Sequence, residues 1–284
     1  MNFLDLFKSK TEGKIANLGI GLGNDLLHNL KILSAIEDFS IKNQCTIYLF
    51  GTKSAISYLL KEKSISTSVC KFIESIEPEK IIIEYLKKNY INAVIRGNLS
   101  SNNFLKNVKS QLHIGEINRL ALLETFDQKQ FFFGPVGIDE CNDFQSKRHF
   151  IENAITYFKS LNIEPRISVL SGGRLNDVGR DDYVDKTIET AEKIVQYFKK
   201  KYSHLVIEHN QILIELAIKN QSNLIIAPDG ISGNLIYRTL VHLGGGNAYG
   251  AIYMGLDYII VDTSRVGKLS EIIGALNMAF SQVR

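Results

Sequence analysis

Residues 166–174 read RISVLSGGR, a run that predicts a buried strand ending in a glycine turn. Ile167, Val169 and Leu170 supply the apolar side chains that such a strand needs. A segment with the apolar spacing of a helix follows at residues 185–201. The order strand, turn, helix is the repeating unit of an α/β protein with a mostly parallel sheet.

The same alternation recurs on both sides of this stretch. Further strands are predicted at residues 14–20, 45–50, 91–95, 117–125, 205–208, 223–227 and 258–262. Further helices are predicted at residues 25–39, from residue 53, and at residues 211–220, 234–243 and 269–282. Residues 131–142, which contain Pro135, are predicted to join two halves of the chain. For 284 residues, one two-lobed fold and two smaller domains remain alternatives.

Composition excludes several classes of protein. The chain is 45% hydrophobic and 22% charged, as expected of a soluble globular protein and not of a disordered one. Its net charge is +3 and its basic residues are spread along the chain, so we expect no nucleic-acid partner. No apolar run approaches the roughly 18 residues of a membrane span, and the first ten residues do not form a signal peptide, so we expect no membrane.

The cysteines and histidines point to no metal. The chain has three cysteines, Cys45, Cys70 and Cys141. They lie far apart in the sequence, which indicates neither a disulfide framework nor a zinc site, and reduced thiols are expected in the cytoplasm. The six histidines do not show the i, i+4 spacing of a helical zinc site.

The turn after residue 170 carries a candidate anion site. In parallel α/β sheets, ligands bind at the carboxyl ends of the strands. Two glycines let backbone N–H groups approach an anion, a serine adds a donor, and two arginines can hold phosphate or carboxylate. The candidate residues are Ser171, Gly172, Gly173, Arg174 and Arg180. The alternative is an ordinary glycine turn before a helix.

Two other strand ends carry polar side chains. After residues 223–227, either ligand binding or helix capping would explain Asp229, Gly230, Ser232 and Asn234. After residues 258–262, substrate orientation, charge stabilisation and general base catalysis would suit Ser264, Arg265 and Glu271, respectively. For that last group, spacing alone slightly favours the alternative, an N-cap with a surface ion pair.

Gly19, Gly21 and Gly23 follow the first strand but do not complete a dinucleotide fingerprint. The third glycine of that motif is replaced by Asn24, and the next strand ends without an acidic residue. A strand-to-helix turn explains these glycines better than a nucleotide or S-adenosylmethionine pocket. The chain also lacks a phosphate loop and a Gly-x-Ser-x-Gly elbow, so we expect neither nucleotide hydrolysis of that type nor a hydrolase triad.

Three stretches together carry a family resemblance: NIEPRISVLS at residues 162–171, DGISGN at residues 229–234, and Ser264-Arg265 followed by EIIGA at residues 271–275. They resemble the phosphate acetyl/butyryltransferase superfamily from about residue 91 to the end of the chain. Within it, the segment from Ser171 to Arg180 is similar to the archaeal methanogenesis marker protein 4 family, which is named as subunit X of a methyltransferase.

The resemblance implies a fold of the phosphotransacetylase and isocitrate/isopropylmalate dehydrogenase type. It is α/β, with two domains, mostly parallel sheets and an interdomain cleft. The last strand and helix return to the first domain, so the expected domains are residues 1–125 plus 258–284 and residues 126–257. A homodimer is common in such proteins.

The resemblance also implies roles for residues. In phosphotransacetylases a Ser-Arg pair lies at the active site, and an Asp seven residues past the Ser is the proposed base toward the thiol of coenzyme A. Here Ser264 and Arg265 keep their types, whereas Glu271 replaces the Asp. A displaced carboxylate alters catalytic geometry. Arg174 departs from the Ser or Thr of the acetyltransferases, and Arg96 takes the place of an arginine expected near the end of the first domain.

We therefore expect a phosphotransacetylase-like transferase of methanogenic archaea that binds a small anionic substrate, phosphate or an acyl or coenzyme A compound, in the cleft. The sequence does not identify a cofactor, and coenzyme A or a related thiol is one candidate. One alternative is a methyltransferase or an associated subunit with a protein partner in methanogenesis. Another is a non-catalytic ligand-binding or assembly protein.

Overall fold

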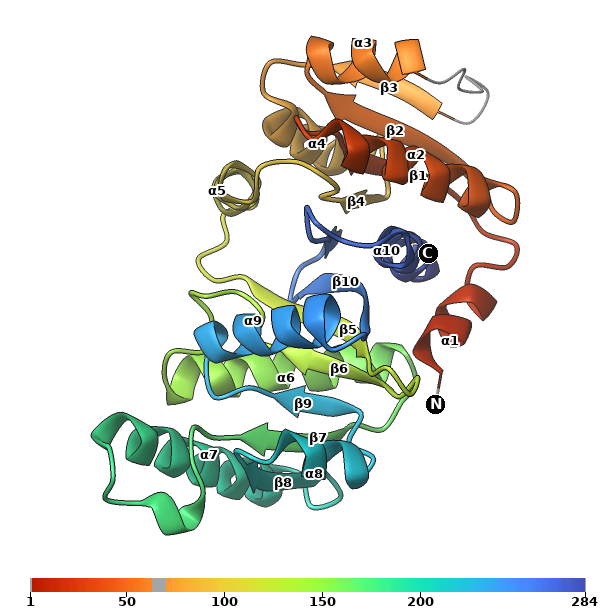
Figure 1. Cartoon of the computed structure of the whole chain (residues 1–284). Coiled ribbons are helices and arrows are strands. Elements are labelled where there is room, and N and C mark those ends of the chain that lie inside the picture. The colour runs from red at the N-terminus through yellow and green to blue at the C-terminus, as the bar shows by residue number, and fades with distance from the viewer. Residues whose placement is uncertain (1, 63–69, 284) are drawn as a thin grey trace. The chain divides into compact units, whose positions relative to one another are not determined.

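A computed structural model describes residues 2–62 and 70–283 (Figure 1). The chain divides into unit 1, residues 1–117 with 247–284, and unit 2, residues 118–246. These limits differ from the predicted ones because two strands were assigned differently. Strand β5 (Asn118–Glu124) pairs with β6 (Gln130–Gly134) inside unit 2, and β10 (Asn247–Met254) pairs with β11 (Ile259–Asp262) inside unit 1.

Unit 1 is built mainly from βα repeats. Besides β10 and β11, its strands are β1 (Ile15–Gly21), β2 (Gln44–Gly51), β3 (Cys70–Glu74) and β4 (Ala93–Ile95). Its helices are α1 (Phe3–Ser9), α2 (Leu26–Ser40), α3 (Lys53–Glu62), α4 (Pro78–Lys87), α5 (Ser101–Leu112) and α10 (Leu269–Gln282). The strands lie in the order β3-β2-β1-β4-β11-β10, and all neighbours are parallel except β11 and β10.

The core of unit 1 is apolar and dominated by isoleucine and aromatic side chains. Helix α4 buries Ile82, Ile83 and Leu86 beside Phe50 of β2 and Phe104 of α5. Helix α10 is buried along most of its length and packs on β10 and α2. Apolar burial of this extent stabilises the unit at roughly 25 cal/mol per Å².

Unit 2 has the same layered organisation. Besides β5 and β6, its strands are β7 (Arg166–Leu170), β8 (Val206–Gln211) and β9 (Leu224–Ile226). Its helices are α6 (Phe144–Ser160), α7 (Asp182–Lys201), α8 (Ile214–Lys219) and α9 (Gly230–Arg238), with a 3-10 turn at Leu175–Asp177 and a π-helical turn at Thr239–Leu243. The strands lie in the order β5-β6-β9-β7-β8, and only β5 and β6 are antiparallel.

Aromatic side chains fill the interior of unit 2. Phe132 of β6 meets Tyr157 and Phe158 of α6 edge-on, with ring centroids 5.6 and 5.3 Å apart. Phe131 and Phe133 are also buried. The run Phe131–Phe133 therefore belongs to a central strand, whereas the sequence analysis placed it in a joining segment because Pro135 follows directly.

The parallel pairing decides which turns share an edge. In unit 2, β7 and β9 are parallel neighbours, so the turns after residues 170 and 226 lie at one edge of the sheet. In unit 1, β4 and β11 are parallel neighbours, so the turns after residues 95 and 262 do the same. The predicted α/β class with a mostly parallel sheet is confirmed, and among the described residues no helix is long and apolar enough to cross a membrane.

Candidate functional site

The turn after β7 is held by hydrogen bonds within unit 2. Ser171 is 1% exposed, and its hydroxyl lies 2.8 Å from the carbonyl oxygen of Gly173. The N–H of Gly172 donates to Oγ1 of Thr187 on α7 at 2.8 Å. The predicted anion-binding turn is therefore rigid, but its serine hydroxyl and one of its N–H groups already have partners.

Asp177 fixes the two arginines that follow this turn. Its carboxylate accepts the backbone N–H of Arg174 at 2.8 Å and the guanidinium of Arg180 at 2.6 Å. These bonds, first that from Arg174 and then that from Arg180, hold the pKa of Asp177 below its usual range. The side chain of Arg174 is exposed, and its guanidinium forms no hydrogen bond with a described residue. It is therefore available to an anion.

The turn after β9 is mainly a helix cap. Asp229 accepts the backbone N–H of Ser232 at 2.8 Å, and Ser232 reaches back to the N–H of Asp229, which is a capping box at the start of α9. Asn234 donates to the carbonyl oxygen of Val136 at 2.9 Å. A Cβ on Gly230 would lie 1.8 Å from the carbonyl oxygen of Gly137, so close backbone packing requires this glycine. Capping, one of the two alternatives from sequence, is thus observed.

Asp229 also has a partner that the sequence did not suggest. Its second oxygen accepts the hydroxyl of Tyr183 at 2.7 Å. Burial alone would raise the pKa of Asp229, but the bonds from Tyr183 and Ser232 lower it. The same bond raises the pKa of Tyr183 to about 12. Both groups therefore keep their ordinary charge states at neutral pH.

Lys147 is a buried cation beneath this turn. It is 1% exposed, and its ammonium donates to the carbonyl oxygen of Pro228 at 2.5 Å. Burial lowers its pKa, against the opposing effects of Cys141 and Asp229. The sequence analysis missed Lys147, although helical spacing places it on the buried face of α6 with Phe150 and Ile151.

In unit 1, the turn after β11 joins two of the predicted catalytic residues. The carboxylate of Glu271 is 3% exposed and accepts the backbone N–H of Ser264 at 2.8 Å. Arg265 is exposed, and its side chain forms no ion pair with a described residue. The carboxylate thus anchors the turn that presents Arg265.

Arg96 lies at the same edge of unit 1 but is only 5% exposed. Its guanidinium bonds the carboxylate of Asp262, the carbonyl oxygen of Thr263 and, at 2.7 Å, the carbonyl oxygen of Leu99. These bonds tie the ends of β4 and β11 together. The substrate role predicted for Arg96 stays a prediction, and the three bonds described here are within unit 1.

Close packing accounts for Gly19 and Gly21 in β1 and for Gly23 just after it. A Cβ on Gly23 would lie 2.0 Å from the carbonyl oxygen of Asn98, and one on Gly21 would lie 2.2 Å from the side chain of Leu99. A Cβ on Gly19 would lie 2.5 Å from the side chain of Ile91. Close neighbours therefore explain this run without a ligand.

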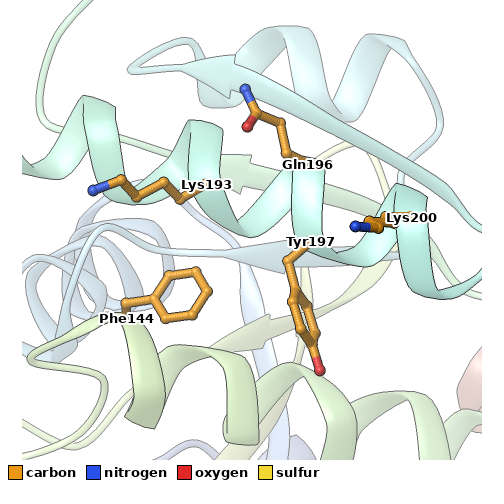
Figure 2. A pocket seen from close by; sticks show the side chains of 5 residues that line it. All are labelled: Phe144, Lys193, Gln196, Tyr197 and Lys200. Atoms are coloured by element: carbon orange, nitrogen blue, oxygen red, sulfur yellow. The ribbon is translucent and has the colours of Figure 1, made fainter.

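A cavity of about 510 Å³ lies against α7 in unit 2, away from the predicted residues. Figure 2 shows Phe144 from α6 beside Lys193, Gln196, Tyr197 and Lys200 from α7. The rings of Phe144 and Tyr197 meet edge-on at 6.2 Å. Among the described residues, no group of three or more His, Cys, Asp or Glu could hold a metal ion.

Residues 28–280 match the model of the phosphate acetyl/butaryl transferase family. The chain belongs to this family. Within the phosphate acetyl/butaryl transferase family it is similar to a "Putative methyltransferase mtx subunit X" of Methanosarcina mazei, at 38% identity over 93% of this chain and 90% of the relative. An "Uncharacterized methyltransferase" of Methanocaldococcus jannaschii is 38% identical over 72% of this chain and 83% of its own length.

Solved structures confirm the fold. A phosphotransacetylase from Streptococcus pyogenes superposes with a TM-score of 0.74 at 16% identity, covering 100% of this chain and 99% of the other. The resemblance to the phosphate acetyl/butyryltransferase superfamily, and to methyltransferase subunit X within it, is thereby confirmed.

Proposed function

We propose that this protein is a phosphotransacetylase-like transferase of methanogenic archaea that binds an anionic phosphate or acyl compound through the turn after β7. Coenzyme A or a related thiol is the acyl carrier in this proposal, and a cytoplasmic homodimer its expected state. The family match supports a transferase fold of this type.

The observation that carries the proposal is the position of Arg174. Asp177 fixes the backbone of Arg174 at the carboxyl edge of a parallel sheet. The guanidinium of Arg174 is exposed and forms no hydrogen bond with a described residue. A glycine turn that served only to start α7 would not need an arginine held in this way. A guanidinium is suited to bidentate contact with phosphate or carboxylate.

In the proposed reaction, the acyl group moves between the thiol and phosphate. In the direction from acyl phosphate, Glu271 takes the thiol proton and the sulfur attacks the acyl carbon. The bond from that carbon to the phosphate oxygen then breaks. Ser264 orients the substrate and Arg265 stabilises negative charge that develops on the carbonyl oxygen. The bond from the Ser264 N–H supports this role, because it fixes the Glu271 carboxylate beside the residue that orients the substrate.

The test is phosphate-dependent release of thiol from a panel of acyl-coenzyme A compounds. Glu271→Gln keeps an oxygen that can accept the N–H of Ser264 but removes the base, so we expect release to fall at least about 100-fold. Arg174→Ala should raise KM for phosphate, whereas Arg166→Ala is the matched control because Arg166 lies at the opposite end of β7. Full activity in Glu271→Gln would contradict its role as base.

Methyl transfer is the second candidate, and the names of the relatives favour it. The glycine run after β1 gives no support for an S-adenosylmethionine site, because its glycines are packed against Asn98 and Leu99. A methyltransferase-associated subunit with a protein partner in methanogenesis is therefore the form this candidate takes. Micromolar binding of S-adenosylmethionine by calorimetry would reverse the ranking, and thiol release from no donor would favour the non-catalytic alternative.

A further inference from the structure

A chain of hydrogen-bonded side chains lies behind the anion-binding turn of unit 2. Oγ of Ser171 lies 2.8 Å from Nε2 of His209 on β8. Nδ1 of the same ring is hydrogen-bonded to the carboxylate of Glu192 on α7. Three elements thus converge on one imidazole, and neither His209 nor Glu192 stood out in the sequence.

A β-bulge places the histidine. Val169 pairs with His209 and Leu170 with Gln211, so Asn210 is an extra residue on β8. Asn210 is buried and accepts the hydroxyl of Ser168 at 3.2 Å. Bulges re-aim side chains and are common beside functional sites.

This arrangement differs from a hydrolase triad, although Ser, His and Glu are all present. Ser171 is 1% exposed, so its oxygen is covered, whereas the Glu192 side chain at the other end is 43% exposed. The N–H of Gly172, the residue that would help form an oxyanion hole, donates to Thr187. The chain therefore supports the turn and does not present a nucleophile.

Counting protons assigns a charge state to the ring. The Ser171 hydroxyl has one proton but lies 2.8 Å from two acceptors, the Gly173 carbonyl oxygen and Nε2 of His209. A neutral imidazole has only one N–H. One of the three contacts, His209 with Glu192, His209 with Ser171 or Ser171 with Gly173, would then have no proton between its two heavy atoms. A protonated ring satisfies all three contacts: Nδ1–H to Glu192, Nε2–H to Ser171, and the hydroxyl to Gly173.

We infer that His209 is a positioning residue whose protonated ring, paired with Glu192, holds the Ser171–Arg174 turn in its anion-binding conformation. The inference rests on the proposed function of that turn. The Gly173 carbonyl and the Arg174 N–H belong to the same peptide group, and Ser171 bonds the first while Asp177 bonds the second. Without the Nε2–H of the His209 ring, the Ser171 hydroxyl turns toward Nε2 and the Gly173 carbonyl loses its donor, which frees one end of this peptide group.

Three elements supply the neighbours of the ring. Glu192 from α7 is the charged group that bonds it, while Val169 of β7 and Ser171 of the turn are uncharged. Glu192 is therefore the residue whose substitution tests the pairing.

The experiment measures sulfate affinity by calorimetry at one pH in the wild type and in each variant, with sulfate as the probe of the turn. His209→Ala removes both ring contacts, so we expect the affinity to fall about three- to tenfold, the upper value corresponding to about 1.4 kcal/mol. His209→Gln keeps an N–H donor for Ser171 and should recover most of the affinity. Glu192→Gln removes the carboxylate that bonds the ring and should lower the affinity by less than His209→Ala does. His204→Gln, an exposed histidine before β8, is the matched control and should behave as wild type.

The outcomes separate this inference from the proposed function. If the sulfate affinity is unchanged in Arg174→Ala, the turn is not an anion site, and the function proposed for the turn is contradicted. Affinity that depends on Arg174 but is unchanged in His209→Ala overturns the role of His209 alone. Nitrogen-15 spectra should show a proton on each ring nitrogen of His209, as the three contacts require, and a neutral ring would also overturn it. Circular dichroism melts of each variant distinguish these results from loss of folding.

Discussion

Two arginines that follow parallel strands, Arg96 in unit 1 and Arg174 in unit 2, differ sharply in burial. In unit 1, Arg96 is 5% exposed and bonds Asp262, Leu99 and Thr263. In unit 2, Arg174 is exposed, and the Arg180 side chain is 76% exposed beside Asp177. The comparison teaches that position after a strand does not separate an arginine that ties strands together from one that is open to a ligand. Burial and the hydrogen-bond partners of the guanidinium separate the two kinds of arginine.

The largest expected effect comes from breaking the buried pair of unit 1. Asp262→Ala leaves the guanidinium of Arg96 buried without its carboxylate, so the free energy of unfolding should fall by about 3–5 kcal/mol. Urea denaturation followed by circular dichroism measures it. A loss below about 1 kcal/mol would mean that Arg96 is not a cross-link, since exposed pairs contribute about that much.

Lys147 sharpens the comparison, because unit 2 buries a cation that can titrate. Burial lowers its pKa in the folded state, while the unfolded chain keeps a value near 10.4. At a pH between the two pKa values, the unfolded chain binds more protons than the folded one. Lys147 therefore makes the free energy of unfolding rise with pH, by about 1.4 kcal/mol for each pH unit between the two pKa values. Lys147→Met should remove that slope in urea denaturation between neutral and alkaline pH. The exposed Lys193→Met is the control, and an unchanged slope in Lys147→Met would contradict the assignment.

Asp229 tests whether the turn after β9 is chiefly a cap. Asp229→Ala removes the acceptor for the Ser232 N–H and should cost about 1 kcal/mol, within a range of about 0.5–2 kcal/mol. Asp229→Asn keeps an acceptor and should cost much less. Equal losses in the two variants, measured by thermal denaturation, would argue that the charge and not the cap matters.

The smallest effect on stability is expected at the open arginines. Arg174→Ala and Arg180→Ala should each change the free energy of unfolding by no more than about 0.5 kcal/mol, because surface changes of this kind are nearly neutral. Their effect should appear in sulfate affinity instead. A stability loss in Arg174→Ala comparable to that of Asp262→Ala would abolish the distinction between the two units.

Local patterns revealed part of this molecule. Helix capping was one of the two alternatives predicted for Asp229 and Ser232, and the strand at residues 166–170 was predicted with its correct limits. Glu271 and Ser264 are seven residues apart and do meet. The continuous apolar run of β6 was missed because Pro135 follows it, and an apolar run without alternation resembles either a buried strand or a connecting segment.

Long-range contacts could not be read from spacing. The partner of Arg96 is Asp262, far along the chain, so nothing local distinguishes Arg96 from an open arginine. His209 meets Ser171 through strand pairing and Glu192 through helix packing, and neither contact has a fixed sequence separation. Tyr183 and Asp229 likewise meet only in the folded unit.

The order in which the chain is made has a consequence for folding. Unit 2 is one uninterrupted segment, residues 118–246, whereas unit 1 is completed by residues 247–284. On the ribosome, unit 2 can therefore fold while β4 still lacks its neighbour β11 and α2 still lacks α10. Until residues 247–284 have been made, an edge of the first sheet and an apolar helix face stay uncovered, and they offer binding surfaces to a chaperone.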